Sequence, residues 1–268
     1  MQKKNYLMIT RNKKIKRSPI KKTPLRTAGQ SLEEEINRIK TEDLVPYIGV
    51  SVFMVTGIIF EWYRWINEMP PRPLAISFAA MIVIAYSGYK ISKYKKQIEK
   101  LKSALKGERA VSEYLDRFRA KGFRLFNDVV AGDFNIDHIL IGNKGIYTIE
   151  TKTISKYQRG SQTIKYDGES ISINGQVPDR DPIIQAKAQA SWVKDVLRDL
   201  TGKTFNVKPV VLYPGWYVDK QPRRADVWVL NPKALDRFIK NEDSVIDEKL
   251  IPSIATHFSR YVRNTKTE

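Results

Sequence analysis

The sequence of 268 residues contains no cysteine and only two histidines, His138 and His257. The absence of cysteine excludes a disulfide scaffold, a catalytic thiol and a thiolate zinc site. Two imidazoles are too few for a histidine-rich metal site. Any metal in this protein would therefore be bound mainly by oxygen atoms, which are the ligands of hard cations such as Mg²⁺ and Mn²⁺.

Acidic residues are also scarce, since 29 Asp and Glu stand against 47 Lys and Arg and give a formal charge of +18. Residues 1–26 hold ten Lys or Arg, no acid and few apolar residues, which predicts a disordered basic tail. A short helix is expected next, because Ser31 and Glu34 have capping-box spacing, and we assign residues 1–43 to the tail and this helix. Such a tail is suited to anionic membrane lipids.

Long uncharged runs occur twice, at residues 44–60 and 74–89. Each run is near the minimum length that spans about 30 Å of hydrocarbon, and both are apolar around the whole helix rather than along one stripe. Aromatic residues flank both runs, as in the interfacial belts of membrane proteins. These features predict two transmembrane helices that form a hairpin over residues 44–91. The alternative is a buried helical hairpin in a soluble protein.

The charges around the two runs predict the orientation of this hairpin. The loop between the runs carries few charges, the basic tail precedes the first run, and five lysines follow the second: Lys90, Lys93, Lys95, Lys96 and Lys100. By the positive-inside rule, both termini are expected in the cytoplasm, so we predict a protein of the cell (inner) membrane with two spans. Residues 92–105 are expected to form a juxtamembrane linker helix.

The pattern changes to that of a mixed α/β domain over residues 106–268. Helix-spaced apolar residues end at Gly122, and three strand-like runs follow at 123–130, 136–142 and 145–152. The sequence GNKG between the last two runs predicts a tight turn and an antiparallel hairpin. Further elements are expected as strands at 207–213 and 227–230 and as helices at 181–200, 232–240 and 251–262.

The register of this hairpin places Asp137 opposite Glu150, and strand alternation puts Lys152 on the same face. Opposed carboxylates repel each other unless a positive charge neutralises them. A divalent cation held by Asp137 and Glu150, with Lys152 orienting a water or balancing charge, would suit hydrolysis at phosphorus. The alternative is a structural salt-bridged cluster in which Lys152 only balances the two acids. The residue pattern alone does not separate these readings.

A resemblance to a known family lies in the order of five segments: GERAVSEYL, FNDV, IDHILIG, GNKGIYTIETK and VKPVVLYP. Residues 104–240 resemble the nuclease-related domain (NERD) family, a branch of the PD-(D/E)xK nuclease-like superfamily. The resemblance implies a restriction-endonuclease-like αβββαβ core with a mixed sheet, and Asp137, Glu150 and Lys152 as the active-site signature. It also suggests Glu108 as an auxiliary acid and Gln185 as a contact for phosphate or water. The N-terminal hairpin lies outside the resemblance.

Each of the remaining candidates has a structural alternative. Glu108 sits in the first turn of its expected helix, where the helix dipole favours an acid, and Gln185 lies on a polar helix edge. His138 is expected to be a packed strand histidine that faces away from Asp137. Three basic residues are expected to contact the nucleic-acid backbone, with a solvated surface as the alternative: Lys156, Arg159 and Lys165.

These features together predict a membrane-anchored nuclease that depends on Mg²⁺ or Mn²⁺ and faces the cytoplasm. Its substrate is expected to be nucleic acid, with DNA favoured over RNA. The alternative is a catalytically silent module that binds nucleic acid or acts as a scaffold at the membrane.

Overall fold

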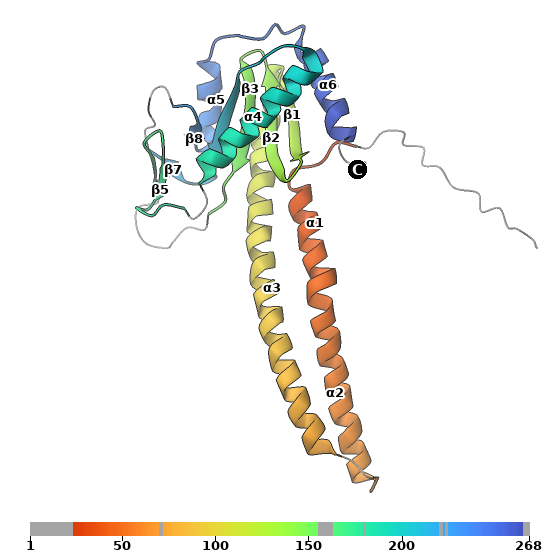
Figure 1. The fold of residues 1–268 in the computed structure, drawn as a ribbon. Coiled ribbons are helices and arrows are strands. Elements are labelled where there is room, and N and C mark those ends of the chain that lie inside the picture. Colours follow the sequence, from red (N-terminus) through yellow and green to blue (C-terminus); the bar gives the residue numbers. More distant parts are fainter. Residues whose placement is uncertain are drawn as a thin grey trace, which may run out of the picture.

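The computed structural model describes residues 24–69, 72–154, 163–178, 181–219, 222 and 225–264. It consists of a long antiparallel pair of helices, residues 30–106, that we call the stalk, and an α/β head at one end of the stalk (Figure 1). Most of the predicted basic tail lies outside the described residues, which begin at Pro24.

One arm of the stalk contains α1 (Gln30–Arg38), the π-helical turn η1 (Ile39–Leu44) and α2 (Val45–Ile66). The turn η1 ends two residues before Pro46, whose ring nitrogen cannot donate a hydrogen bond to the preceding turn, and a wider turn accommodates the ring. The other arm is α3 (Pro73–Asp116), which runs unbroken from the tip of the stalk into the head (Figure 1).

The two arms pack against each other near the head and are joined by polar contacts at the tip. Near the head, Ile36, Ile39 and Ile98 form a small buried cluster. At the tip, Glu61 accepts hydrogen bonds from Arg64 Nη1 at 2.9 Å and from the backbone N–H of Arg72 at 3.2 Å. These contacts neutralise the buried carboxylate of Glu61 where the chain reverses.

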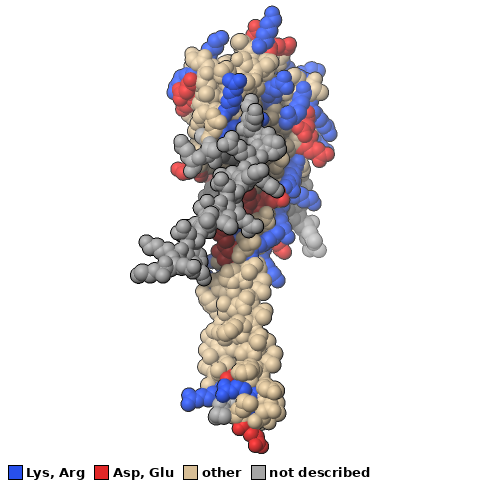
Figure 2. Space-filling model, turned by 90° about the vertical axis from the view of Figure 1, so that its right-hand side faces the viewer, with Lys and Arg blue, Asp and Glu red and all other residues tan. Residues whose placement is uncertain are grey.

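Between these ends, apolar side chains of both arms face outward. Phe53 of α2 is 72% exposed and Leu74 of α3 is 75% exposed, and Figure 2 shows a band without charged side chains along this part of the stalk. Two helical stretches, Gln30–Ile66 and Pro73–Lys121, are long and apolar enough to cross a membrane, and their most apolar windows are only 0% and 11% buried. The predicted hairpin is therefore present as two candidate spans, and their exposure does not fit a hairpin buried in a soluble core.

The helix α3 joins segments that were expected to be separate. The second apolar run, the linker helix at 92–105 and the first helix of the α/β domain form one continuous helix. The physical reason is that residues 89–106 contain neither glycine nor proline and include seven lysines and two leucines, which favour helix. No structural boundary therefore lies at residue 91 or 105.

The head is built on a five-stranded mixed sheet of order β1-β2-β3-β6-β8. Strands β1 (Arg124–Ala131), β2 (Phe134–Gly142) and β3 (Gly145–Thr151) are antiparallel neighbours, while β6 (Val207–Leu212) and β8 (Trp228–Leu230) continue the sheet in parallel. The predicted hairpin register is confirmed, because Ile141 pairs with Ile146 and His138 with Ile149.

Helices cover both faces of this sheet. On one face, α4 (Pro182–Thr201) and α6 (Ile251–Asn264) pack on strand residues such as Ile139 and Ile146. On the other face, α3 and α5 (Pro232–Lys240) pack on Leu140 and Ile149. This arrangement confirms the restriction-endonuclease-like αβββαβ core with a mixed sheet.

A smaller sheet of order β5-β4-β7 lies beside the main one. It contains the hairpin of β4 (Thr163–Tyr166) and β5 (Ile171–Ile173), to which β7 (Tyr217–Val218) adds in parallel. The two-residue strand β7 was not expected from the sequence, because a run of two residues carries no periodicity.

Candidate active site

The ends of β2 and β3 bring Asp137, Glu150 and Lys152 together at one edge of the main sheet. The backbone N–H of Thr151 donates to Asp137 Oδ2 at 2.7 Å, so the aspartate side chain closes the hairpin where the backbone ladder ends. The backbone N–H of Lys152 donates to the carbonyl of Leu212 at 2.9 Å and ties this edge to β6. These backbone bonds hold all three residues close to one another.

Glu150 and Lys152 form an ion pair on one face of β3, as strand alternation predicted. Lys152 Nζ lies 2.7 Å from Glu150 Oε1 and also donates to Gln185 Oε1 of α4 at 2.9 Å. Glu150 is buried, whereas the side chain of Lys152 keeps 29% of its surface exposed. The ammonium group is therefore oriented from within the protein while remaining accessible from outside.

The structure adds Gln189 to this group, which sequence reasoning did not single out. Gln189 is fully buried, and its Nε2 donates to Glu150 Oε2 at 2.6 Å and to the carbonyl of Asn135 at 3.1 Å. The signal was its position four residues after Gln185, one helical turn along the same face. We call Asp137, Glu150, Lys152, Gln185 and Gln189 the sheet-edge group.

A second group of acids lies beside the first and is neutralised differently. The N-terminus of α1 docks on the head: the backbone N–H of Gly29 donates to Glu108 Oε1 at 2.7 Å, and that of Ser31 donates to Asp128 Oδ2 at 2.9 Å. Asp128 also forms a buried ion pair with Arg26. The first turn of a helix leaves backbone N–H groups without partners inside the helix. In α1, carboxylates of the head accept hydrogen bonds from these groups.

This docking corrects two expectations about the N-terminal segment. Arg26 was assigned to the disordered tail, yet its side chain is 10% exposed and bonded to Asp128. The capping box of Ser31 and Glu34 does not form, because the N-cap of α1 is Gly29, two residues before Ser31, and the Ser31 hydroxyl instead accepts a hydrogen bond from Arg26 Nη2 at 2.8 Å. We call Arg26, Gly29, Ser31, Glu108 and Asp128 the docking group.

Asp128 was missed because its role depends on contacts distant in the sequence. It is buried, and its backbone has a φ of 49°, a left-handed conformation that aspartate adopts more readily than most residues. Its partners Arg26 and Ser31 lie about a hundred residues earlier in the chain. The adjacent Asn127 in the segment FNDV would have been the only local hint.

Burial and mutual repulsion raise the pKa of an acid in each group, Asp137 in the sheet-edge group and Glu108 in the docking group. Desolvation, with the negative charges of Glu150 and Glu108, raises the pKa of Asp137 well above its ordinary value, against the opposing hydrogen bond from Thr151. Desolvation likewise raises the pKa of Glu108 to about 7, although the N–H of Gly29 acts in the opposite direction. The two groups are therefore electrostatically linked.

The remaining sequence candidates are placed as follows. His138 is fully buried, its Nδ1 lies 2.9 Å from Asn127 Oδ1, and burial lowers its pKa to about 3, so it is the packed, neutral strand histidine that was expected. Lys165 is exposed on β4. Lys156 and Arg159 lie outside the described residues.

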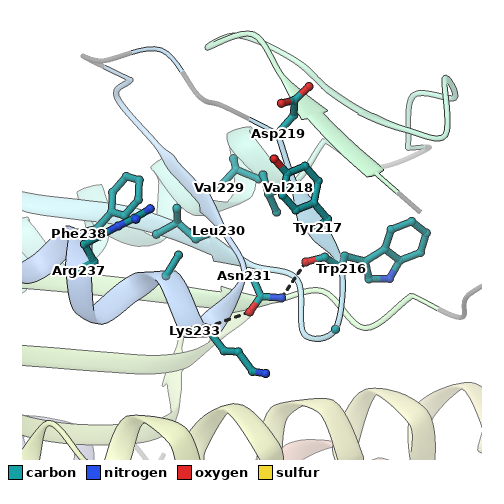
Figure 3. Close-up of a pocket in the computed structure, with 12 residues that line it drawn as sticks. Trp216, Tyr217, Val218, Asp219, Val229, Leu230, Asn231, Lys233, Arg237 and Phe238 are labelled. Carbon is teal, nitrogen blue, oxygen red and sulfur yellow. Dashed lines mark hydrogen bonds between the residues drawn. The ribbon is translucent and has the colours of Figure 1, made fainter. Parts of the chain in front are cut away.

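The same edge of the sheet continues into an open hollow of about 900 Å³ (Figure 3). Val229 and Leu230 of β8 lie at its base, with Tyr217 on one side and α5 on the other. Trp216 links the hollow to the sheet-edge group, because its Nε1 donates to the carbonyl of Ile154 at 3.1 Å and its own carbonyl accepts from Asn231 Nδ2 at 2.7 Å. Among the described residues, none of the site residues predicted from sequence lines this hollow.

The oxygen atoms available to a metal come mainly from two residues. In the part of the chain that the structure describes, no group of three or more His, Asp or Glu side chains is arranged to hold a metal ion. Asp137 Oδ1 accepts no hydrogen bond from another described residue, whereas both oxygens of Glu150 are bonded, to Lys152 and to Gln189. The arrangement thus offers a pair of carboxylates together with one ammonium group.

Comparison with known proteins agrees with this architecture. The αβββαβ core and the site at its sheet edge define a nuclease-like fold. Residues 103–214 match the family model of the nuclease-related domain, and this part of the chain is a nuclease-related domain. No curated protein matches the chain.

Among solved structures, the chain is similar to that of Pyrococcus furiosus SfsA in complex with Ca²⁺, with 18% sequence identity and a TM-score of 0.24. The similarity covers 46% of this chain and 52% of that one, so the chain spans about half the length of that protein.

Proposed function

We propose that the head is a metal-dependent nuclease that hydrolyses phosphodiester bonds of DNA, or of RNA as the second choice. The observation that carries this proposal is the sheet-edge group, in which Asp137 lies beside the Glu150–Lys152 ion pair within a nuclease-related domain. A buried acid next to an oriented, accessible lysine is what hydrolysis of a phosphate ester requires.

We assign Asp137 and Glu150 as ligands of Mg²⁺ or Mn²⁺. The donor set suits a hard cation, because it consists of carboxylate oxygens and one of them, Asp137 Oδ1, has no hydrogen-bond partner among the described residues. The repulsion that raises the pKa of Asp137 is the kind of interaction that a cation relieves. When bound, the ion would neutralise phosphate charge and make water more acidic.

Each of the other residues has a role that follows from its contacts. Lys152 places its ammonium group against a phosphate oxygen, where negative charge grows as water attacks phosphorus. Gln185 orients Lys152, and Gln189 orients Glu150. Glu108, whose pKa is raised to about 7, is poised to accept the proton of the attacking water as the bond to the leaving sugar oxygen breaks.

The stalk anchors this nuclease in the cell (inner) membrane. Its exposed apolar band and two candidate spans support insertion, and the lysines that follow the second span support a cytoplasmic head. The basic residues before Pro24 would then lie near the same membrane surface and bind anionic lipids. A reporter fused after Glu268 should read cytoplasmic, and one inserted near Pro71 should read external; a soluble full-length chain without detergent would contradict this placement.

A scaffold that binds nucleic acid without cleaving it is the second candidate. One observation favours it: both oxygens of Glu150 are already bonded, as in a closed structural cluster. The scaffold and the nuclease differ in whether a cation changes the stability of the head and whether substrate is turned over.

The deciding experiment measures the thermal midpoint of the purified full chain with and without Mg²⁺ or Mn²⁺, together with cleavage of single- and double-stranded DNA and RNA. The nuclease proposal expects a metal-induced rise in midpoint that Asp137→Ala abolishes, and cleavage that requires the ion. A midpoint that does not respond to metal, with no cleavage of any substrate, would leave the scaffold as the function.

A further inference from the structure

Seven lysines lie on α3 between the apolar band and the head, with Glu99 as the single acid between residues 90 and 107. Six of the seven are exposed: Lys93, Lys95, Lys96, Lys100, Lys102 and Lys106. Among the described residues, the ion pairs of the stalk and of the first turns of the head use arginines, namely Arg26, Arg38, Arg64 and Arg109, and none of these lysines. The lysines of this part of α3 therefore form a basic surface that no ion pair of the described residues neutralises.

The contact between α3 and the end of β3 shows which of these lysines lie beneath the sheet-edge group. Thr153, which follows Lys152, packs so closely on Gly107 that a Cβ atom at residue 107 would lie 1.7 Å from Thr153 Oγ1. The side of α3 that Gly107 occupies is therefore the side that faces the chain leaving the site.

Helical geometry places two lysines on that same side. Lys100 precedes Gly107 by seven residues and Lys96 by eleven, and at about 100° per residue both point within about 20° of Gly107. They lie about 10 Å and 16 Å below it along the helix axis, at about 1.5 Å per residue. Lys102 and Lys106 are equally exposed but point more than about 90° away.

Distance from the membrane decides between lipid and nucleic acid as the partner. The apolar run ends at Tyr89, so Lys93 lies about 6 Å above it, among lipid headgroups, whereas Lys100 lies about 16 Å above it. The headgroup layer is about 5–7 Å thick, and the potential of anionic lipids decays over about 8 Å at physiological ionic strength. Lys100 is therefore at the limit of lipid attraction, and it points to the side of α3 that faces the chain leaving the sheet-edge group.

We propose that Lys96 and Lys100 bind the phosphate backbone of a nucleic-acid strand that reaches the sheet-edge group from the membrane side of the head. The stalk would then guide the substrate as well as anchor the protein. Phosphate contacts of this kind position a strand without reading its sequence, so the surface should not discriminate between base sequences. The inference rests on the proposed function for the identity of the ligand and on the membrane placement for its geometry.

The test uses the full chain in nanodiscs of neutral lipid and a fluorescent oligonucleotide, titrated without divalent ions over a range of salt concentrations. Lys96→Glu with Lys100→Glu should weaken binding by about 10- to 30-fold and reduce the salt slope by about 1.5, as expected for two lost phosphate contacts. The matched control is Lys102→Glu with Lys106→Glu, which has the same spacing and the same change of charge on the other side of the helix. The control should keep its affinity within about twofold.

The corresponding glutamine variants repeat the test with charge removal only, in case charge reversal disturbs the stalk. Equal losses in the two pairs would overturn the proposal, because they would show a general effect of net charge. The titration is repeated in nanodiscs that contain anionic lipid. If the two pairs of variants differ only there and not in neutral lipid, the proposal is overturned and the lysines are assigned to the membrane.

Cleavage assays on the same samples separate this inference from the proposed function. If the wild-type chain cleaves and the Lys96 and Lys100 variants bind normally, the inference fails and the nuclease stands. If no sample cleaves but only these variants lose affinity, the inference is supported and the nuclease proposal fails.

Discussion

The sheet-edge group and the docking group are neighbouring sets of buried carboxylates that differ in what neutralises them. Glu150 is bonded by side chains of the head, Lys152 and Gln189. Glu108 and Asp128 are bonded by backbone N–H groups of α1, and Asp128 also by Arg26. One residue type thus serves two purposes: the first group leaves an accessible ammonium group for chemistry, and the second attaches the N-terminal arm of the stalk to the head.

The largest expected effect separates the groups by activity. Lys152→Ala removes the positive charge that faces the phosphate, so cleavage should fall by about 10²–10³-fold. The thermal midpoint should fall as well, because the variant leaves the buried Glu150 with only Gln189 as a partner. Initial rates with single-stranded DNA measure the effect, and Lys194→Ala, on the exposed side of α4, serves as the control. Equal activity in the two variants would mean that the Glu150–Lys152 pair is only structural.

The next effect should appear mainly in stability. Arg26→Ala leaves Asp128 buried without its cation, which should cost about 3 kcal/mol or release α1 from the head. Hydrogen exchange at residues 28–34 measures this release. Arg38→Ala is the control, because its pair with Glu35 is exposed and should contribute less than about 0.5 kcal/mol. Matching exchange rates in the two variants would show that Arg26 does not hold the arm.

The pH dependence of stability probes the link between the groups. The pKa of Glu108 is raised from 4.5 to about 7 in the folded protein, so the folded state binds more protons than the unfolded state between these values, and stability falls as the pH rises through this window. Glu108→Gln keeps an acceptor for the Gly29 N–H but carries no charge. In the Glu108→Gln variant, the free energy of unfolding should therefore fall by roughly 2–3 kcal/mol less over this pH window than in the wild-type protein.

Thermal midpoints measured from pH 4.5 to 7.5 check this expectation, and Asp116→Asn provides the control on an exposed acid of the same helix. The wild-type protein and the Asp116→Asn variant should lose stability in parallel as the pH rises. If the Glu108→Gln variant follows the same curve, Glu108 does not titrate near neutrality.

The smallest effect concerns the contact that joins α3 to the end of β3. Gly107→Ala should favour the helix by about 1 kcal/mol, but the new Cβ would meet Thr153 Oγ1 at 1.7 Å and force the segment after Lys152 to move. We expect nearly unchanged stability with about a tenfold loss of cleavage, because small misplacements of a site have large kinetic effects. Adding Thr153→Ala to Gly107→Ala should restore part of the activity. If Gly107→Ala alone keeps full activity, this contact does not position the site.

Local sequence signals predicted much of the head. The turn GNKG set the β2–β3 register, and with it the meeting of Asp137, Glu150 and Lys152. Asp181 before Pro182 predicted the start of α4, where the Asp181 side chain accepts from the N–H of Ile183 at 2.8 Å. These predictions succeed because turns, caps and strand alternation depend on residues a few positions apart.

The parts that were missed depend on residues that are distant in the sequence. Asp128 looked like one acid in a strand, and Arg26 looked like one base in a tail, until the fold placed them in contact. Gln189 looked like a helix edge until α4 packed over Glu150. The domain boundaries expected at residues 91 and 105 lie within the continuous helix α3, because helix propensity continues through them, and they stay predictions.

The sequence by itself therefore determined the apolar spans, the order of strands and helices and the identity of the Asp137, Glu150 and Lys152 trio, since each is written in short-range patterns of charge and hydrophobicity. Only the tertiary structure decided which charges neutralise which acids, that α1 docks on Glu108 and Asp128, and that the Gly107 side of α3 faces the chain after Lys152. The physical reason is that the strength of an electrostatic interaction depends on how deeply the charged group is buried and on its nearest partners. Both are set by packing between segments far apart in the chain.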